Sequence, residues 1–172
     1  MIRYKLSRDA KILFVGINPH PGSYSRGVPF SNNKTFWYLM NRAGLIREKE
    51  SDLRRDEKLK QMYETRFKQV YHLNFINLVN RPTKEVKYLN RGEEKKGAAK
   101  LLEAIHVYHP TVICFIGKVT YSKFTGQSKV DFGWHEPINN SKAYVMHFPI
   151  RGSASIRIEE FKEINDEASQ QQ

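Results

Sequence analysis

The sequence is poor in cysteine and contains no long apolar run. Cys114 is its single cysteine, which excludes an internal disulfide, a cysteine-based zinc site and a four-cysteine iron–sulfur cluster held by this chain alone. Its apolar runs are as short as residues 112–116, whereas a membrane-spanning helix needs about 20 apolar residues. The first residues also lack the apolar stretch and cleavage site of a signal peptide. We therefore expect an intracellular protein that does not enter a membrane.

Acidic residues are also scarce. The chain has 18 Asp and Glu against 29 Lys and Arg among 172 residues, a formal net charge of +11, and a pI near 9.7. This excess favours a polyanionic partner, with nucleic acid ahead of a membrane surface. The alternative is a basic protein kept soluble by surface lysines. Because hydrophobic residues make up 40% of the chain, we expect a folded protein, and its length fits one domain over residues 1–172.

Apolar stretches alternate with segments of helical spacing along the chain. Continuous apolar runs are typical of strands that are buried on both faces of a parallel sheet. The predicted strands cover residues 11–15, 74–79, 112–116 and 143–147, and the predicted helices cover about 36–43, 47–69, 98–105 and 156–164. The alternation predicts an α/β fold with three layers, α/β/α, around a central, mostly parallel sheet of four or five strands. We interpret 47–69 as one amphipathic surface helix.

A polar amide follows the first predicted strand. The strand stops at Gly16, and Asn18 precedes Pro19 in a stretch rich in Gly, Pro, Ser and Asn, which predicts a long loop over residues 16–33. Ligands of such folds bind beyond the carboxyl ends of the strands, where this loop begins. Asparagine is a weak base, but its amide oxygen can orient a water and its NH₂ can donate to a carbonyl. The alternative is a side chain that only bonds to its own turn.

Other candidate sites have weaker patterns. Gly117-Lys118 lacks the preceding glycine of a phosphate-binding P-loop. The histidines lack the spacing of metal ligands, so we predict no metal and no cofactor. Asp131 and Glu136 flank Gly133-Trp134 in what we interpret as a solvated loop.

Several short motifs occur in a fixed order. They are Gly16-Ile17-Asn18-Pro19, Gly27-Val28-Pro29-Phe30, Phe36-Trp37, Ala43-Gly44-Leu45, Asn77-Leu78-Val79, Arg81-Pro82-Thr83, Gly117-Lys118 and Val145-Met146. This order resembles the uracil-DNA glycosylase superfamily, and in particular its mismatch-specific uracil/thymine-DNA glycosylase branch, over roughly residues 11–160. Other branches carry a four-cysteine iron–sulfur cluster, which the single Cys114 excludes.

The resemblance implies a monofunctional enzyme of base excision repair. Such enzymes flip uracil, or thymine mispaired with guanine, out of DNA and hydrolyse the N-glycosidic bond. Asn18 matches the position that holds the attacking water, and Phe30 matches the aromatic residue on which the flipped base stacks. Ser23 matches a position that lines the pocket near the pyrimidine C5, and backbone N–H groups near Ile17 and Phe30 would bind the base edge. Without the resemblance, Phe30 would be interpreted as an ordinary core residue.

The last motif departs from the mismatch-specific branch. That branch has a Pro-Ser-Gly or Pro-Ser-Ser-Ser stretch where this chain has residues 147–157, beginning His147-Phe148-Pro149. His147 could donate to the base oxygen, although a structural histidine at a strand end is equally consistent with the pattern. The remaining candidates contact DNA: Arg151, Ile156 or Arg157 would fill the hole left by the flipped base, and Ser153 and Ser155 would bind phosphates.

Two alternative functions remain open. One is a different base specificity in the same superfamily, such as hypoxanthine or xanthine, because His20-Pro21 also departs from the branch pattern. The other is a nucleic-acid-binding domain without activity, against which the presence of Asn18 argues. We expect a monomer in the cytoplasm, associated with the nucleoid, whose partner is double-stranded DNA with a damaged or mismatched base.

Overall fold

The computed structural model describes residues 1–150 and 152–170. At its centre is a five-stranded sheet with the order β2-β1-β3-β5-β4. Its strands are β1 (Ile12–Gly16), β2 (Leu73–Asn77), β3 (Val112–Ile116), β4 (Gly133–Ile138) and β5 (Ser141–Met146). Four strands are parallel, and β4 pairs with β5 in the antiparallel direction. The predicted fold class is therefore confirmed.

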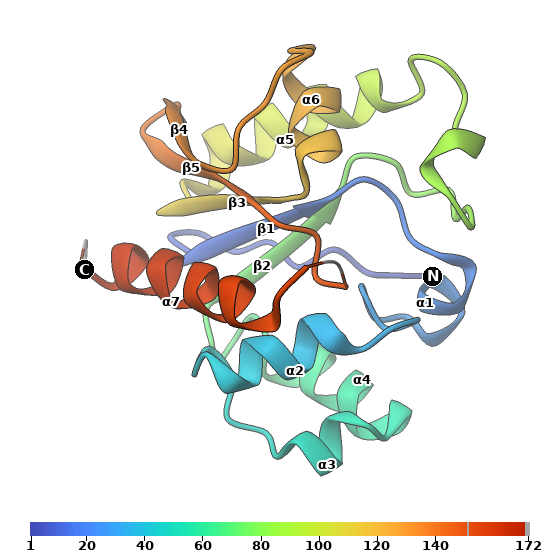
Figure 1. Ribbon diagram of the computed structural model, residues 1–172, viewed down its shortest axis with the longest axis vertical. Coiled ribbons are helices and arrows are strands. Elements are labelled where there is room, and N and C mark those ends of the chain that lie inside the picture. The colour runs from blue at the N-terminus through green and yellow to red at the C-terminus, as the bar shows by residue number, and fades with distance from the viewer. Residues whose placement is uncertain (151, 171–172) are drawn as a thin grey trace.

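Helices cover both faces of the sheet. They are α1 (Pro21–Arg26), α2 (Thr35–Arg42), α3 (Glu50–Leu53), α4 (Asp56–Thr65), the short 3₁₀ helix η1 (Val86–Tyr88), α5 (Glu94–Tyr108), α6 (Lys118–Thr125) and α7 (Ala154–Gln170). Figure 1 shows α5 and α6 on one face and α2, α4 and α7 on the other. None of the helices in the described part of the chain is long and apolar enough to cross a membrane.

Two apolar cores separate the three layers. The core under α2, α4 and α7 contains a group of aromatic rings that includes Phe14, Phe36 and Phe161, whose centroids lie between 5.5 and 6.1 Å apart. The core under α5 and α6 is mainly aliphatic, with Phe115 as one of its rings. Every residue of β1, β2 and β3 is buried, which explains the continuous apolar runs of β1 and β3.

The predicted strands are found within a few residues of their expected positions, but the helices differ from prediction in three places. The long loop predicted over 16–33 contains α1, which Pro21 begins and Gly27 ends with φ +75°. The single helix predicted over 47–69 is two helices, α3 and α4, with a break at Arg54 and Arg55. A further helix, α6, follows Gly117 directly.

The segment from Gly133, interpreted from sequence as a solvated loop, is the edge strand β4. Its side chains are mostly exposed or half-buried, so it lacks the apolar run of a central strand. Pro137 has no N–H to donate, and the pairing with β5 shifts register between His135 and Ile138. These features explain why the sequence pattern did not predict a strand.

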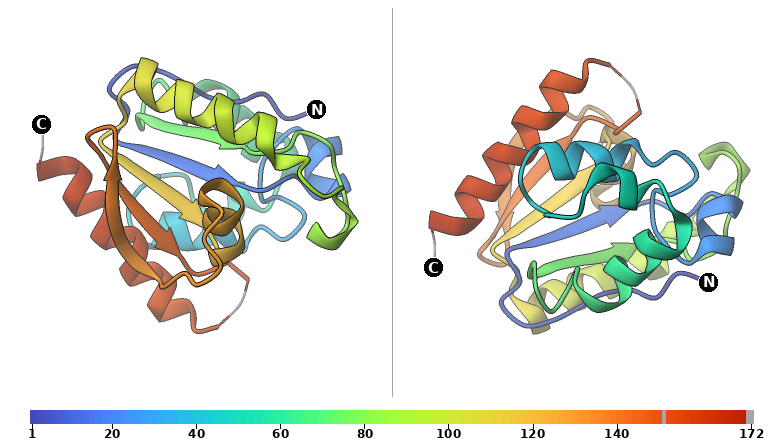
Figure 2. Two further views of the ribbon diagram at one scale, coloured as in Figure 1. Left: turned by 90° about the horizontal axis from the view of Figure 1, so that it is seen from above. Right: turned by 90° about the horizontal axis from the view of Figure 1, so that it is seen from below.

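The carboxyl ends of the parallel strands lie at one edge of the sheet. Figure 2 shows their arrowheads pointing the same way, with α1 and the segment after β2 beyond them. The loops after β1, β2, β3 and β5 all start at this edge, as expected for the ligand-binding edge of an α/β sheet.

Candidate active site

The loop after β1 is joined to the loop after β2 by backbone hydrogen bonds. Leu78 N donates to Gly16 O over 3.0 Å, and Val79 N donates to Ile17 O over 2.7 Å. These contacts continue the pairing of β1 with β2 beyond the ends of the strands. The backbone immediately before residue 18 is therefore fixed.

The side chain of Asn18 is held by the segment after β2. Its Nδ2 donates to Arg81 O over 3.0 Å and to Thr83 Oγ1 over 2.8 Å. Thr83 Oγ1 donates its own hydrogen to Glu85 O over 2.8 Å, so its oxygen accepts from Asn18. Because both hydrogens of the amide are engaged, the Asn18 atom left to contact a water is Oδ1, an acceptor. Donation from this NH₂ group to a carbonyl of a bound molecule, which the residue type allows, is not available in this arrangement.

An ion pair closes the loop that carries Thr83. Arg81 donates to Glu93 through Nε over 3.1 Å and through Nη2 over 2.9 Å, and Nη2 also donates to Tyr88 O over 3.1 Å. The hydrogen bond to Glu93 raises the pKa of Arg81, and the same contact lowers the pKa of the Glu93 carboxyl. The pair is exposed and adds little stability. Its main effect is to fix the backbone carbonyl of Arg81, which accepts the hydrogen bond from Asn18 Nδ2.

The ring of Phe30 lies over the end of β1. Its centroid is 4.5 Å from that of Phe36 and 5.6 Å from that of Phe75. A Cβ atom at Gly16 would lie 3.2 Å from Phe30 Cζ and 2.5 Å from Asn77 Oδ1, so only glycine allows this approach. Phe30 has φ +54°, in the left-handed region, which is uncommon for a bulky residue and depends on support from its surroundings.

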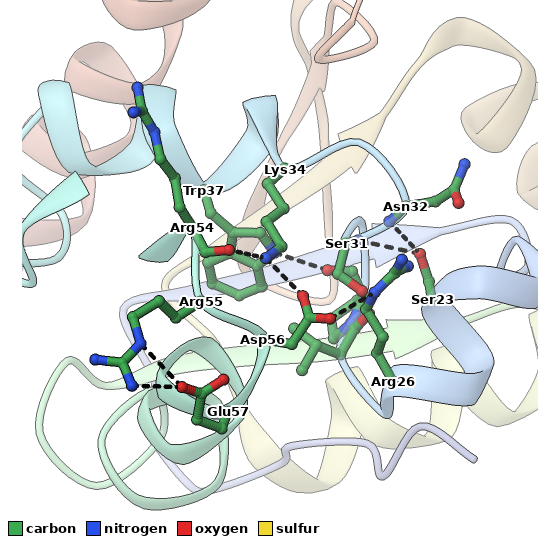
Figure 3. A network of polar contacts seen from close by, with 12 residues as sticks. Ser23, Arg26, Ser31, Asn32, Lys34, Trp37, Arg54, Arg55, Asp56 and Glu57 are labelled. Atoms are coloured by element: carbon green, nitrogen blue, oxygen red, sulfur yellow. Dashed lines mark hydrogen bonds and ion pairs between the residues drawn. The ribbon is translucent and has the colours of Figure 1, made fainter. Parts of the chain in front are cut away.

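The backbone carbonyls of the two residues before Phe30 are held by buried side chains (Figure 3). Trp37 Nε1 donates to Pro29 O over 2.8 Å, and Ser31 Oγ donates to Val28 O over 2.7 Å. These bonds support the left-handed backbone of Phe30, because they fix the two residues that lead into it.

Ser23 anchors the same loop from α1. Its side chain is 2% exposed, and its Oγ accepts from Ser31 N over 3.0 Å and from Asn32 N over 2.9 Å. The hydroxyl oxygen predicted to line the pocket therefore also shapes the loop that carries Phe30.

A charged network supports this loop from outside. Lys34 Nζ donates to Arg54 O over 2.6 Å and contacts Asp56 Oδ1 at 2.6 Å, while Arg26 Nε lies 3.3 Å from Asp56 Oδ2. The hydrogen bond from Lys34 lowers the pKa of the Asp56 carboxyl. Asp56 thus links α1 and α4 to the segment between Phe30 and α2.

At the end of β5, His147 is paired with a buried carboxylate. Glu160 Oε1 accepts from His147 N over 3.2 Å and lies 3.0 Å from His147 Nδ1. The imidazole also stacks on Phe132 with a centroid distance of 3.5 Å. A hollow of about 450 Å³ lies beside this pair, with Tyr144 and Ile156 among its lining residues. His147 is therefore fixed at both its backbone and its ring.

The loop after β5 exposes apolar and hydroxyl side chains. Ile150 and Ile156 are each 49% exposed. Ser153 and Ser155 are exposed at the start of α7, with their Oγ atoms 2.7 Å apart. Arg151 lies outside the described residues.

Arg157 has a different environment from the other predicted DNA-contacting residues. It is buried in α7, and its guanidinium donates to the carbonyl oxygens of Phe148, Pro149 and Gly152. In this arrangement Arg157 faces its own loop and not the solvent.

The comparison with known families agrees with this geometry. A family model described as the uracil DNA glycosylase superfamily matches residues 4–166, from before β1 into α7. The chain belongs to this superfamily. Members of the uracil DNA glycosylase superfamily are DNA glycosylases, hydrolases that act on DNA. The predicted superfamily is thus confirmed, and the mismatch-specific branch stays a prediction.

In this superfamily member, the predicted site residues come from two loops at one sheet edge. Asn18 and Phe30 follow β1, whereas His147, Ser153 and Ser155 follow β5. Only β3 lies between these two strands. The fold therefore brings residues that are far apart in the sequence to the same edge.

Two residues with a clear role in this geometry are not among the site residues predicted from sequence. The signal for Thr83 is its place in a polar loop after a buried strand. Glu160 gave no signal, because a glutamate on a charged helix is expected in solvent.

The described residues contain no group of three His, Cys, Asp or Glu side chains arranged to hold a metal ion. Burial raises the pKa of the Cys114 thiol, which makes it a poor nucleophile.

Proposed function

We propose that this protein removes uracil, or thymine mispaired with guanine, from double-stranded DNA by hydrolysing the N-glycosidic bond. The observation that carries the proposal is the orientation of Asn18. Its NH₂ group is engaged by Arg81 O and Thr83 Oγ1, so Oδ1 is the atom that can accept a hydrogen from a water at the strand edge. A fixed acceptor at this position supports a water held for attack on the sugar.

In the proposed reaction the water oxygen forms a bond to C1′ of the deoxyribose as the bond from C1′ to the base breaks. The electron pair of that bond leaves with the base, and the proton lost by the water goes to solvent. Asn18 orients the water but takes no proton, because an amide is a weak base. No enzyme amine attacks the sugar, so no covalent intermediate forms.

The flipped base would stack on Phe30. The ring is partly exposed, packed on Phe36 and held over Gly16, which supports a rigid aromatic surface beside Asn18. The N–H of Ile17 would contact the base edge, and Ser23 would line the pocket through the loop that it anchors. His147 would donate to the base oxygen from the β5 side.

DNA would be held by groups around the same edge. Ser153 and Ser155 stand at the N-terminus of α7, where a helix favours phosphate. The exposed apolar side chain of Ile156 would fill the space left by the base. A cationic segment after β2 would contact phosphates further along the duplex; its exposed residues are Lys84, Lys87, Arg91, Lys95 and Lys96.

A base-release assay tests this proposal. Labelled duplexes carry uracil, thymine or hypoxanthine opposite each normal base, and alkali cleaves the abasic sites that form. We expect release of uracil, with thymine released when it is opposite guanine. Asn18→Ala should bind the duplex but release base about 100-fold more slowly, because a positioned group is lost. Asn41→Ala is the matched control, since Asn41 Nδ2 also donates to two carbonyls, Ile46 O and Glu48 O.

Other results of this assay would point to a different function or a different catalytic residue. Release of hypoxanthine without uracil would indicate the other base specificity. Duplex binding without release of any base would indicate a nucleic-acid-binding domain without activity. A wild-type rate in Asn18→Ala, or an adduct trapped by borohydride, would show that the catalytic assignment is wrong.

A further inference from the structure

Two buried charged residues lie one turn apart on α7. Arg157 is 4% exposed and Glu160 is 6% exposed, although charged side chains are rarely buried unless they are paired. Both face the loop that runs from β5 to α7. Their hydrogen-bond partners are atoms of this loop and Tyr144 of β5. The two charges are therefore buried where they can bind the loop.

Arg157 binds the backbone of this loop. It donates through Nη1 to Phe148 O and Pro149 O, and through Nη2 to Gly152 O. Burial lowers the pKa of Arg157, an effect that Glu160 partly opposes. Its Nε has no hydrogen-bond partner among the described residues. Because a buried guanidinium with an unpaired nitrogen is costly, the contribution of this side chain lies in the loop contacts and not in core packing.

Glu160 binds the start of the same loop. Its Oε1 accepts from His147 N and contacts His147 Nδ1, and its Oε2 accepts from Tyr144 OH over 3.2 Å. Arg157 thus binds carbonyl oxygens of the loop, while Glu160 contacts the backbone N–H and the ring Nδ1 of His147 at its beginning. One helix therefore binds both N–H and C=O groups of the described loop residues, at His147, Phe148, Pro149 and Gly152.

The fixed loop carries exposed apolar side chains. Phe148 is 39% exposed and Ile150 is 49% exposed. Phe148 Cδ2 lies 3.7 Å from the position of a Cβ atom at Gly117, so this ring lies over the end of β3, between the Asn18 loop and β5. Apolar side chains on a loop at a DNA-binding edge suit insertion into the base stack.

We propose that Arg157 and Glu160 are positioning residues that hold the β5–α7 loop ready to enter the base stack. The proposal rests on the proposed function, since it assigns the loop a step in base release. A loop that is ordered before DNA arrives loses little entropy on binding. Arg157 and Glu160 together form a clamp on this loop. The clamp therefore matters most when the base must be taken out of an intact duplex, and least when the base is already unpaired.

Arg157→Lys tests the clamp, because an ammonium cannot bind three carbonyls in the planar geometry of a guanidinium. The substrates are a duplex with a uracil–guanine pair and the same duplex with uracil in a bubble of unpaired bases. We expect single-turnover release from the paired duplex to fall about ten-fold, and release from the bubble to change less than about two-fold. Arg66→Lys is the matched control, since Arg66 binds Glu48 and Tyr71 away from the site.

A second variant tests the loop without touching α7. Gly152 has φ +79°, and a Cβ there would meet no atom within 4 Å, so Gly152→Ala strains only the backbone. Gly126→Ala is its control, because Gly126 also has φ +79° and open space around it but lies at the end of α6. We expect Gly152→Ala to slow uracil release selectively from the paired duplex, and Gly126→Ala to leave release from both substrates unchanged.

Hydrogen exchange of the free protein provides a readout that needs no activity. Deuterium uptake over residues 147–153 should rise in Arg157→Lys and Gly152→Ala and stay unchanged in the two controls. Equal loss on both substrates, no loss on either, or unchanged uptake would overturn the clamp. If the wild-type protein releases no base from either substrate, the proposed function fails, and the uptake measurement alone decides whether Arg157 holds the loop.

Discussion

Thr83 Oγ1 accepts a hydrogen bond of 2.8 Å from Asn18 Nδ2, across 65 residues of sequence. The hydroxyl hydrogen of Thr83 is directed to Glu85 O, which leaves its oxygen as the acceptor. Together with the hydrogen bond to Arg81 O, this contact determines which end of the Asn18 amide meets a water. The site thus depends on the loop after β2 as well as on the loop after β1.

Thr83→Val should lower the rate of base release about ten-fold, because the lost hydrogen bond lets the Asn18 amide rotate. Binding of an uncleavable duplex should stay close to that of the wild type. Thr83→Ser restores the hydroxyl and should restore most of the rate. Single-turnover kinetics and a binding titration make the comparison, and a Thr83→Val rate equal to wild type would remove Thr83 from the positioning of Asn18.

Phe30→Leu should cut uracil release about ten-fold or more, because stacking of a base on an aromatic ring contributes about 1–3 kcal/mol. Leucine keeps most of the apolar contact with Phe36, so the thermal midpoint separates loss of stacking from loss of folding. Phe124→Leu, on the opposite face of the sheet, is the control. A folded Phe30→Leu variant with full activity would return Phe30 to a purely structural role.

Binding to undamaged duplex should weaken steeply as salt rises, because each neutralised phosphate releases counterions and contributes about −0.9 to the log–log slope. Replacing both Lys95 and Lys96 by alanine should make this slope shallower. Replacing both Lys58 and Lys60 on α4 by alanine should leave it unchanged. Fluorescence anisotropy at several salt concentrations measures both, and equal effects of the two pairs would place the DNA on a different face.

Asp56→Asn should destabilise the protein slightly at neutral pH, by at most about 1 kcal/mol, because the Asp56 side chain of this pair is 58% exposed. Since the hydrogen bond from Lys34 lowers the pKa of Asp56 below the ordinary value of an aspartate, the stabilising effect is present above that ordinary value. It is lost as the pH falls through the lower pKa of the folded state. Thermal midpoints of the two proteins should therefore converge in strong acid, and a constant difference at all pH values would contradict this role for Asp56.

The central strands could be predicted because burial on both faces requires continuous apolar residues. β3 occupies the predicted residues 112–116, and Asn18 stands where a polar residue after a buried strand must stand, at the sheet edge. Local composition fixes both features. The superfamily could be predicted from the order of the motifs, and it is confirmed over residues 4–166.

Features that depend on distant partners could not be predicted. Arg157 was expected to contact DNA, but its guanidinium binds the carbonyls of its own loop. Nothing in the surrounding sequence shows that α7 would turn this residue inward. The direction of the Asn18 amide also depends on Thr83, which only the pairing of β1 with β2 brings close.

The irregular edge strand β4 has a consequence for the behaviour of this protein in concentrated solution. A straight outer strand would offer a free row of N–H and C=O groups to a second molecule. Pro137 has no N–H to donate, and the register shift between His135 and Ile138 interrupts the regular spacing of the strand. A second chain therefore cannot readily add a strand at this edge of the sheet. This opposes aggregation through edge-to-edge strand pairing.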